Sequence, residues 1–153
     1  MKVSIEVEDS AWDAVPGLEE LTRDAVAAAL ADADAADSEI VILFTDDIAI
    51  TGLNAEWRGK NSPTNVLSFS TPPDMVIPEG EPRPLGDIVL ASGVVAREAL
   101  EQGKSLRDHT AHLIVHGVLH LLGHDHVDET QAAEMERLET GILKGLGISN
   151  PYE

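Results

Sequence analysis

The sequence predicts one α+β domain over residues 1–153, in which about five or six helices pack on a mixed sheet of about four strands. Three observations carry this prediction. The chain has 153 residues, about the length of one domain; short apolar runs alternate with longer segments of helical periodicity; and no repeat or low-complexity linker divides it. Hydrophobic residues make up 43% of the chain and aromatic residues only 3%, so the core must be mostly aliphatic.

Four segments have the composition of strands. Residues 2–7 alternate apolar and polar side chains, as a half-buried strand does. The continuous apolar runs at 40–44 and 88–90 predict more buried strands, and residues 64–70 form a fourth candidate. Residues 71–84 contain five prolines, which predicts an irregular loop before the last strand.

Five segments have the apolar spacing and the end signals of helices. Acidic side chains in the first turn of one of them, Glu19 and Glu20, favour a helix N-terminus. Glycines at 145 and 147 end the last one. The predicted helices cover about residues 16–34, 47–57, 93–103, 105–122 and 128–143.

The chain is strongly acidic, with 10 Lys and Arg against 28 Asp and Glu and a net charge of −18. Such acidity favours solubility and opposes binding to nucleic acid. The distribution of charge along the chain weakens the argument against nucleic-acid binding. Residues 57–73 contain no acid but include Arg58 and Lys60. An anionic ligand could therefore contact this stretch.

Several classes of protein are excluded by what the sequence lacks. The absence of cysteine removes disulfides, thiolate catalysis and thiolate metal ligands. No apolar run reaches the length of about 18 residues that a membrane span needs, and the N-terminus has no signal pattern. We therefore expect a cytoplasmic protein without a membrane partner.

Three histidines within HGVLHLLGHDH (residues 116–126) have the spacing of a metal site. His116 and His120 are four residues apart, which places both rings on one face of a helix, about 40° apart. A continuing helix would turn His126 away, but Gly123 can adopt the left-handed conformation that ends a helix. We therefore predict a metal site on a buried helix and the turn after it. Three histidines with an open position are typical of catalytic zinc, so we expect one Zn²⁺ per chain.

The spacing H-x-x-x-H-x-x-G-x-x-H is also that of the metzincin proteases. Those enzymes carry a glutamate directly after the first histidine as general base, and here that position is Gly117. A metzincin-like metalloprotease is therefore an alternative interpretation, which keeps the metal ligands and lacks the base.

Two upstream segments extend the motif: NAEWRGKNSPTNVLSF (residues 54–69) and LGDI (residues 85–88). Together with the histidine segment they closely resemble the YbeY family of bacterial endoribonucleases and ribosomal RNA maturation factors. The resemblance implies an α+β fold, one zinc bound by His116, His120 and His126, and Arg58 as the catalytic residue.

The same resemblance implies a single-strand-specific zinc metallo-endoribonuclease in ribosomal RNA processing. Its expected roles are maturation of the 16S rRNA 3′ end and late-stage ribosome quality control, with the ribosome or its small subunit as partner and no DNA substrate. A non-catalytic, zinc-stabilised ribosome assembly factor is the second alternative. The nucleophile stays open between an activated water and the RNA 2′-hydroxyl.

Four further residues lie near the motif. Asn65 stands where the family usually has aspartate, which removes a negative charge. His112 lies one turn before His116, and we expect it to be buried beside the ligands or to face RNA. The alternative, a fourth metal ligand, is disfavoured because catalysis needs an open position. Asp125 is expected to orient a ligand imidazole or to cap the turn, and His109 to be a solvent-exposed helix residue.

Overall fold

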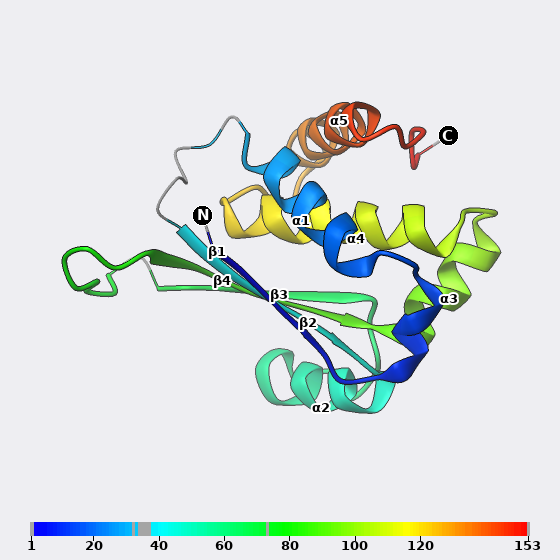
Figure 1. The fold of residues 1–153 in the computed structure, drawn as a ribbon, viewed down its shortest axis with the longest axis horizontal. Helices are drawn as coiled ribbons and strands as arrows, with labels where there is room; N and C mark the ends of the chain where they lie inside the picture. The colour runs from blue at the N-terminus through cyan, green and yellow to red at the C-terminus, as the bar shows by residue number, and fades with distance from the viewer. Residues whose placement is uncertain (1, 32, 34–37, 73, 153) are drawn as a thin grey trace.

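A four-stranded mixed sheet forms the centre of the fold in the computed structural model, which describes residues 2–31, 33, 38–72 and 74–152 (Figure 1). The order of strands is β1 (Lys2–Val7), β2 (Ser38–Thr45), β4 (Arg83–Ala91) and β3 (Val66–Ser70). The first three strands run parallel, and β3 pairs antiparallel with β4 at one edge. The predicted α+β class and the four-stranded mixed sheet are confirmed.

Helices cover both faces of this sheet, but unequally (Figure 1). The described helices are α1 (Leu18–Ala29), α2 (Asp47–Arg58), α3 (Ser92–Glu101), α4 (Leu106–Leu121), α5 (Glu129–Gly145) and a short 3₁₀ helix at Ser10–Ala14. Helix α2 lies on one face, whereas α1 and α4 lie on the other, with α5 packed against them on the side away from the sheet. Among the described helices, none combines the length and the hydrophobicity that a transmembrane span requires.

The main hydrophobic core lies between the sheet and α4. Strand residues such as Ile42, Ile88 and Leu90 are fully buried there, and α4 is apolar on almost every side, as its sequence predicts. The core is mostly aliphatic, with one aromatic pair formed by Trp12 and Phe44, whose ring centroids are 4.9 Å apart. The 3₁₀ helix that carries Trp12 has no periodicity long enough to be predicted from sequence.

Two elements differ from the predicted bounds by more than two residues at one end. The first helix ends at Ala29 instead of near residue 34, and residues 32 and 34–37 lie outside the described part of the chain. Strand β4 begins at Arg83, inside the predicted loop, and contains a bulge at Leu85: Glu39 pairs with Pro84, and the next residue of β2 pairs with Gly86. The proline is tolerated at the start of the strand.

Helix α4 lies close to the sheet at Gly117. A Cβ atom added there would lie 3.0 Å from the Cγ2 atom of Ile88 and 3.2 Å from the Oγ atom of Ser68. A larger residue would need these side chains to shift by a few tenths of an ångström, so glycine allows the helix to lie this close to the sheet. The same contact places the residues on either side of Gly117 close to strand β3.

Candidate metal centre

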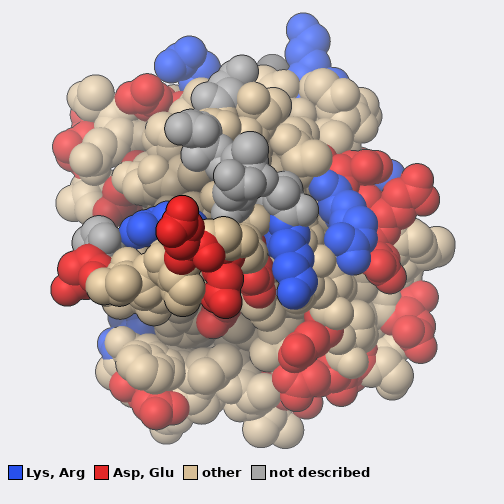
Figure 2. All heavy atoms as spheres, turned by 60° about the vertical axis from the view of Figure 1, so that its left-hand side comes forward, with Lys and Arg blue, Asp and Glu red and all other residues tan. Residues whose placement is uncertain are grey.

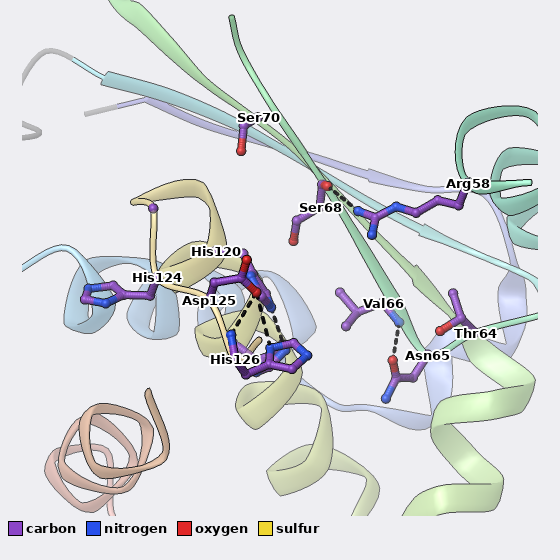
Figure 3. A pocket seen from close by; sticks show the side chains of 12 residues that line it. Arg58, Thr64, Asn65, Val66, Ser68, Ser70, His120, His124, Asp125 and His126 are labelled. Carbon is purple, nitrogen blue, oxygen red and sulfur yellow. Dashed lines mark hydrogen bonds and ion pairs between the residues drawn. The ribbon is translucent and has the colours of Figure 1, made fainter. Parts of the chain in front are cut away.

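The structure brings the three predicted histidines together at the C-terminal end of α4. His120 projects from the helix and His126 from the segment after it (Figure 3). His116 also lies on α4, and the ligand nitrogens of the three histidines lie within 4.8 Å of one another. The Nε2 atoms of His116 and His120 are 3.0 Å apart. Two ligands of one tetrahedral zinc ion, each at about 2.0–2.1 Å, are about 3.4 Å apart, so these residues fit such an ion.

A glycine turn positions the third histidine, as predicted. Helix α4 ends at Leu121, and Gly123 has a φ of 100°. The backbone N–H of His124 then donates to the carbonyl oxygen of Leu119 at 3.0 Å, which closes the helix in the manner of a Schellman turn. This reversal returns the chain toward α4, so His126 faces the two helical ligands.

The chemistry of the donor set also suits a cation. Burial is the largest effect on His120 and lowers its pKa, and the neighbouring His116 and His126 lower it further. The imidazole of His120 is therefore neutral at neutral pH and keeps a free lone pair. Neutral imidazoles are the form in which histidine binds a metal.

The histidines open into a polar pocket of about 630 Å³. Arg58 reaches this pocket from α2, and its guanidinium donates to the backbone oxygen of Ser68 at 3.1 Å (Figure 3). Half of the lining comes from the acid-free stretch, and among the described lining residues the only carboxylate is that of Asp125. The lining residues are Arg58, Thr64, Asn65, Val66, Ser68, Ser70, His116, His120, Gly123, His124, Asp125 and His126.

One wall of the pocket is the free edge of strand β3. The N–H of Ala91 donates to the carbonyl of Asn65 and the N–H of Thr71 to that of Leu85, each at 3.1 Å. In an antiparallel pair these bonded positions alternate with positions that face outward, so the backbones of residues 66, 68 and 70 face away from β4. These three residues line the pocket, and Arg58 occupies the outward carbonyl of Ser68.

A carboxylate that the sequence analysis missed lies directly behind the histidines. Glu139 of α5 has 0% exposure, and its Oε1 atom is hydrogen-bonded to Nδ1 of His116. Burial opposes its ionisation, but the nearby His112 and the hydrogen bonds from His116 and Tyr152 prevail and lower the pKa of Glu139 to about 2. The sequence did contain a signal for a buried acid. Glu139 lies four residues after Met135 and four before Leu143, so it falls on the apolar stripe that α5 buries.

Tyr152 and His112 complete the surroundings of this carboxylate. The Tyr152 hydroxyl donates to Oε2 of Glu139, and Nε2 of His112 lies 3.3 Å from that hydroxyl and 3.6 Å from Oε2. Burial and the bond to Glu139 raise the pKa of Tyr152 above its ordinary value. Of the two positions expected for His112, the structure shows the buried one beside the ligands.

The expectation for His109 is wrong. Its side chain is 3% exposed, because its position on α4 faces α3, and its Nε2 atom lies 2.9 Å from Oε1 of Glu98. Burial lowers the pKa of His109, so the pair holds a neutral imidazole. Glu98 also accepts a hydrogen bond from the Asn65 amide at 3.0 Å, which ties the pocket wall to α3.

Asp125 holds the turn. Its Oδ1 atom accepts the backbone N–H of His126 at 2.7 Å and lies 3.9 Å from Nδ1 of the same residue, beyond hydrogen-bond distance. His124 points away from the other histidines (Figure 3). Of the two roles expected for Asp125, the contacts favour the cap.

An α+β fold that holds three histidines in an open polar pocket is typical of metal-dependent hydrolases. Comparison with known proteins shows which family within this class the chain belongs to. The family model described as "Endoribonuclease YbeY" matches residues 4–147. The chain belongs to this family, which confirms the predicted family and enzyme class, a hydrolytic nuclease.

Individual relatives agree over nearly the whole chain. A protein of Paramagnetospirillum magneticum named "Endoribonuclease YbeY" is 47% identical and is matched over 99% of this chain and 96% of its own length. A protein of the same name from a Chelativorans species is 51% identical, over 92% and 86% of the two chains. A solution structure of a Thermotoga maritima protein shares the fold, with a TM-score of 0.60 and 22% identity over 93% of this chain and 87% of its own.

Proposed function

We propose that the chain is a zinc-dependent endoribonuclease specific for single-stranded RNA. One observation carries the proposal: a three-histidine site of catalytic composition and Arg58 line the same polar pocket. The name shared by the relatives supports the type of reaction. The catalytic role belongs to Arg58 and the metal-binding role to His116, His120 and His126.

Zinc is the metal that best suits these ligands. Three imidazoles without a thiolate or a fourth protein ligand form the common donor set of catalytic zinc. When bound, zinc supplies a Lewis acid for a phosphoryl oxygen and lowers the pKa of a coordinated water. In the protein itself, His116 and His120 are held by α4, while the turn at Gly123 brings in His126.

Arg58 contributes positive charge where the phosphate would lie. Its guanidinium carries five N–H donors, and the bond to the Ser68 carbonyl orients the group at the pocket wall. The planar donors that remain can bind two phosphate oxygens at once and stabilise the charge that develops on them. This contact would position the RNA backbone beside the histidines.

The acidity of the protein does not prevent such binding. On the face shown in Figure 2, acidic side chains are spread widely and lie beside basic ones. Among the described residues of the pocket, in contrast, Asp125 is the single acid. Charges elsewhere are screened over about 8 Å at physiological salt, so the local lining determines the interaction with RNA.

The structure also argues against a protease. The position that carries the general base in metzincins is Gly117, which has no side chain and faces Ile88 and Ser68 in a tight contact. The ligand spacing is thus shared with peptidases, but the residue that would activate water for peptide hydrolysis has no counterpart at this position.

We extend the proposal to the cellular substrate on the basis of the motif resemblance. The RNA is ribosomal, the reaction matures the 3′ end of 16S rRNA and contributes to late-stage ribosome quality control, and the partner is the ribosome or its small subunit in the cytoplasm. Mapping 16S rRNA 3′ ends in cells depleted of the protein tests this extension. Unchanged ends would contradict it.

The biochemical proposal is tested with labelled single-stranded RNA, the matching duplex, a fully 2′-deoxy strand and casein. Cleavage of the single strand alone among the RNAs, abolished by a chelator and restored by zinc, is the expected result. Casein cleavage would favour the protease, and binding to the small subunit without any cleavage would favour the assembly factor. Cleavage of the deoxy strand would assign attack to water, since that strand lacks the 2′-hydroxyl.

A further inference from the structure

We propose that Glu139 is a positioning residue for the metal ligand His116, and that Tyr152 holds Glu139 in place. The inference rests on the proposed metal site and is independent of whether the protein cuts RNA. It assigns a function to a buried acid on α5, which supplies none of the three ligands. The contacts of the carboxylate carry the argument.

Both oxygens of the Glu139 carboxylate are occupied. Oε1 is bonded to Nδ1 of His116, and Oε2 accepts from the Tyr152 hydroxyl. Nε2 of His112 lies 3.6 Å from Oε2. No lysine or arginine is among these partners, so hydrogen bonds from neighbouring side chains stabilise the buried carboxylate.

The bond to Nδ1 determines which nitrogen of His116 is available. A carboxylate accepts hydrogen bonds, so the proton lies on Nδ1 and the lone pair on Nε2. It is Nε2 of His116 that lies 3.0 Å from Nε2 of His120. Glu139 therefore selects the tautomer and the ring orientation that direct the lone pair to the shared metal position.

The C-terminal segment holds Tyr152 in position for this contact. The backbone N–H of Tyr152 donates to Oδ1 of Asn150 at 2.8 Å, and the Lys104 ammonium donates to the carbonyl of Pro151 at 2.7 Å. The first bond lies within the segment after α5, and the second attaches that segment to the region before α4. The hydroxyl of Tyr152 is thereby held at hydrogen-bond distance from Oε2 of Glu139, the oxygen that does not bind His116.

The test compares Glu139→Gln with the parent and with Glu134→Gln, a matched change at an exposed position of the same helix. Zinc affinity is measured by competition with a chromophoric chelator, and ligand geometry by the visible spectrum of the Co²⁺ form. We expect Glu139→Gln to bind zinc about 10–100-fold more weakly, with an altered Co²⁺ spectrum. Glu134→Gln should match the parent.

Parental zinc affinity and an unchanged Co²⁺ spectrum in a folded Glu139→Gln protein would overturn the proposal, even if the thermal stability of the metal-free form changed. If Glu139→Gln does not fold, Tyr152→Phe decides, since it removes one hydroxyl: weaker zinc binding supports the proposal, and parental binding overturns it. A parent that binds one zinc but does not cut RNA would refute the nuclease and leave this inference standing.

Discussion

The Nε2 atoms of His116 and His120 lie 3.0 Å apart, one helical turn from each other on α4. Without a metal, one imidazole can donate a hydrogen bond to the other across this distance. When both Nε2 atoms carry a lone pair, the same arrangement allows the two rings to bind one cation. The pair is therefore compatible with a shared metal ion.

Removal of His120 should remove the metal. Three histidines form the one cluster of suitable donors in the described part of the chain, so the purified parent should hold about one zinc per chain. The His120→Ala protein should lose most of it, as measured by elemental analysis after dialysis. Full retention of zinc by this variant would show that the ligand assignment is wrong.

The turn at Gly123 should be essential for backbone reasons alone. A Cβ atom would meet nothing within 4 Å at Gly123 or at Gly141, but Gly123 has a φ of 100° whereas Gly141 is helical. Gly123→Ala should therefore destabilise the fold by about 1–2 kcal/mol and weaken zinc binding. Gly141→Ala should stabilise it by up to about 1 kcal/mol. Urea unfolding of the metal-free proteins measures both, and equal effects of the two changes would refute the turn argument.

Replacement of Arg58 should separate catalysis from metal binding. Arg58 contacts Ser68 and no histidine, so Arg58→Ala should keep its zinc and lose RNA cleavage about 10²–10³-fold. Arg58→Lys should recover only part of the rate, since an ammonium cannot form a two-pronged contact. Arg107→Ala is the control, because Arg107 lies at the N-terminal end of α4, away from the histidines. It should keep the parental rate. A parental rate from Arg58→Ala would exclude the residue from the mechanism.

Acid should unfold the metal-free protein partly through Glu139. Its pKa in the fold is about 2, below the ordinary value of 4.5, so its ionisation stabilises the fold above pH 4.5. This contribution is lost as the pH falls through the folded pKa, and its size is on the order of 3 kcal/mol. The free energy of unfolding should therefore decrease more between pH 5 and pH 3 in the parent than in Glu139→Gln. Parallel pH profiles of the two proteins would contradict the assignment.

The parts of the site that follow from local spacing could be predicted from the sequence. His116 and His120 share a helix face, and Gly123 permits the reversal that brings in His126, so short-range geometry determines all three. The acid-free stretch around Arg58 likewise pointed to the pocket lining.

The contacts that depend on tertiary packing could not be predicted. Glu139 is 23 residues from His116 along the chain, and Tyr152 is 13 residues further on, so only the docking of α5 brings them together. The burial of His109 could not be predicted for the same reason, because it depends on the packing of α3 against α4. The bulge at Leu85 arises from the pairing of β4 with β2, which no local pattern contains.

The close contact at Gly117 has a consequence for how a metal ion would be received. Because α4 packs this closely against Ile88, the helix backbone that carries His116 and His120 is held against the sheet before a metal binds. His126 lies on the turn with a side chain 56% exposed. The side chain of His126 should therefore lose most of the conformational freedom that metal binding costs. The imidazoles of His116 and His120 are preorganised by α4.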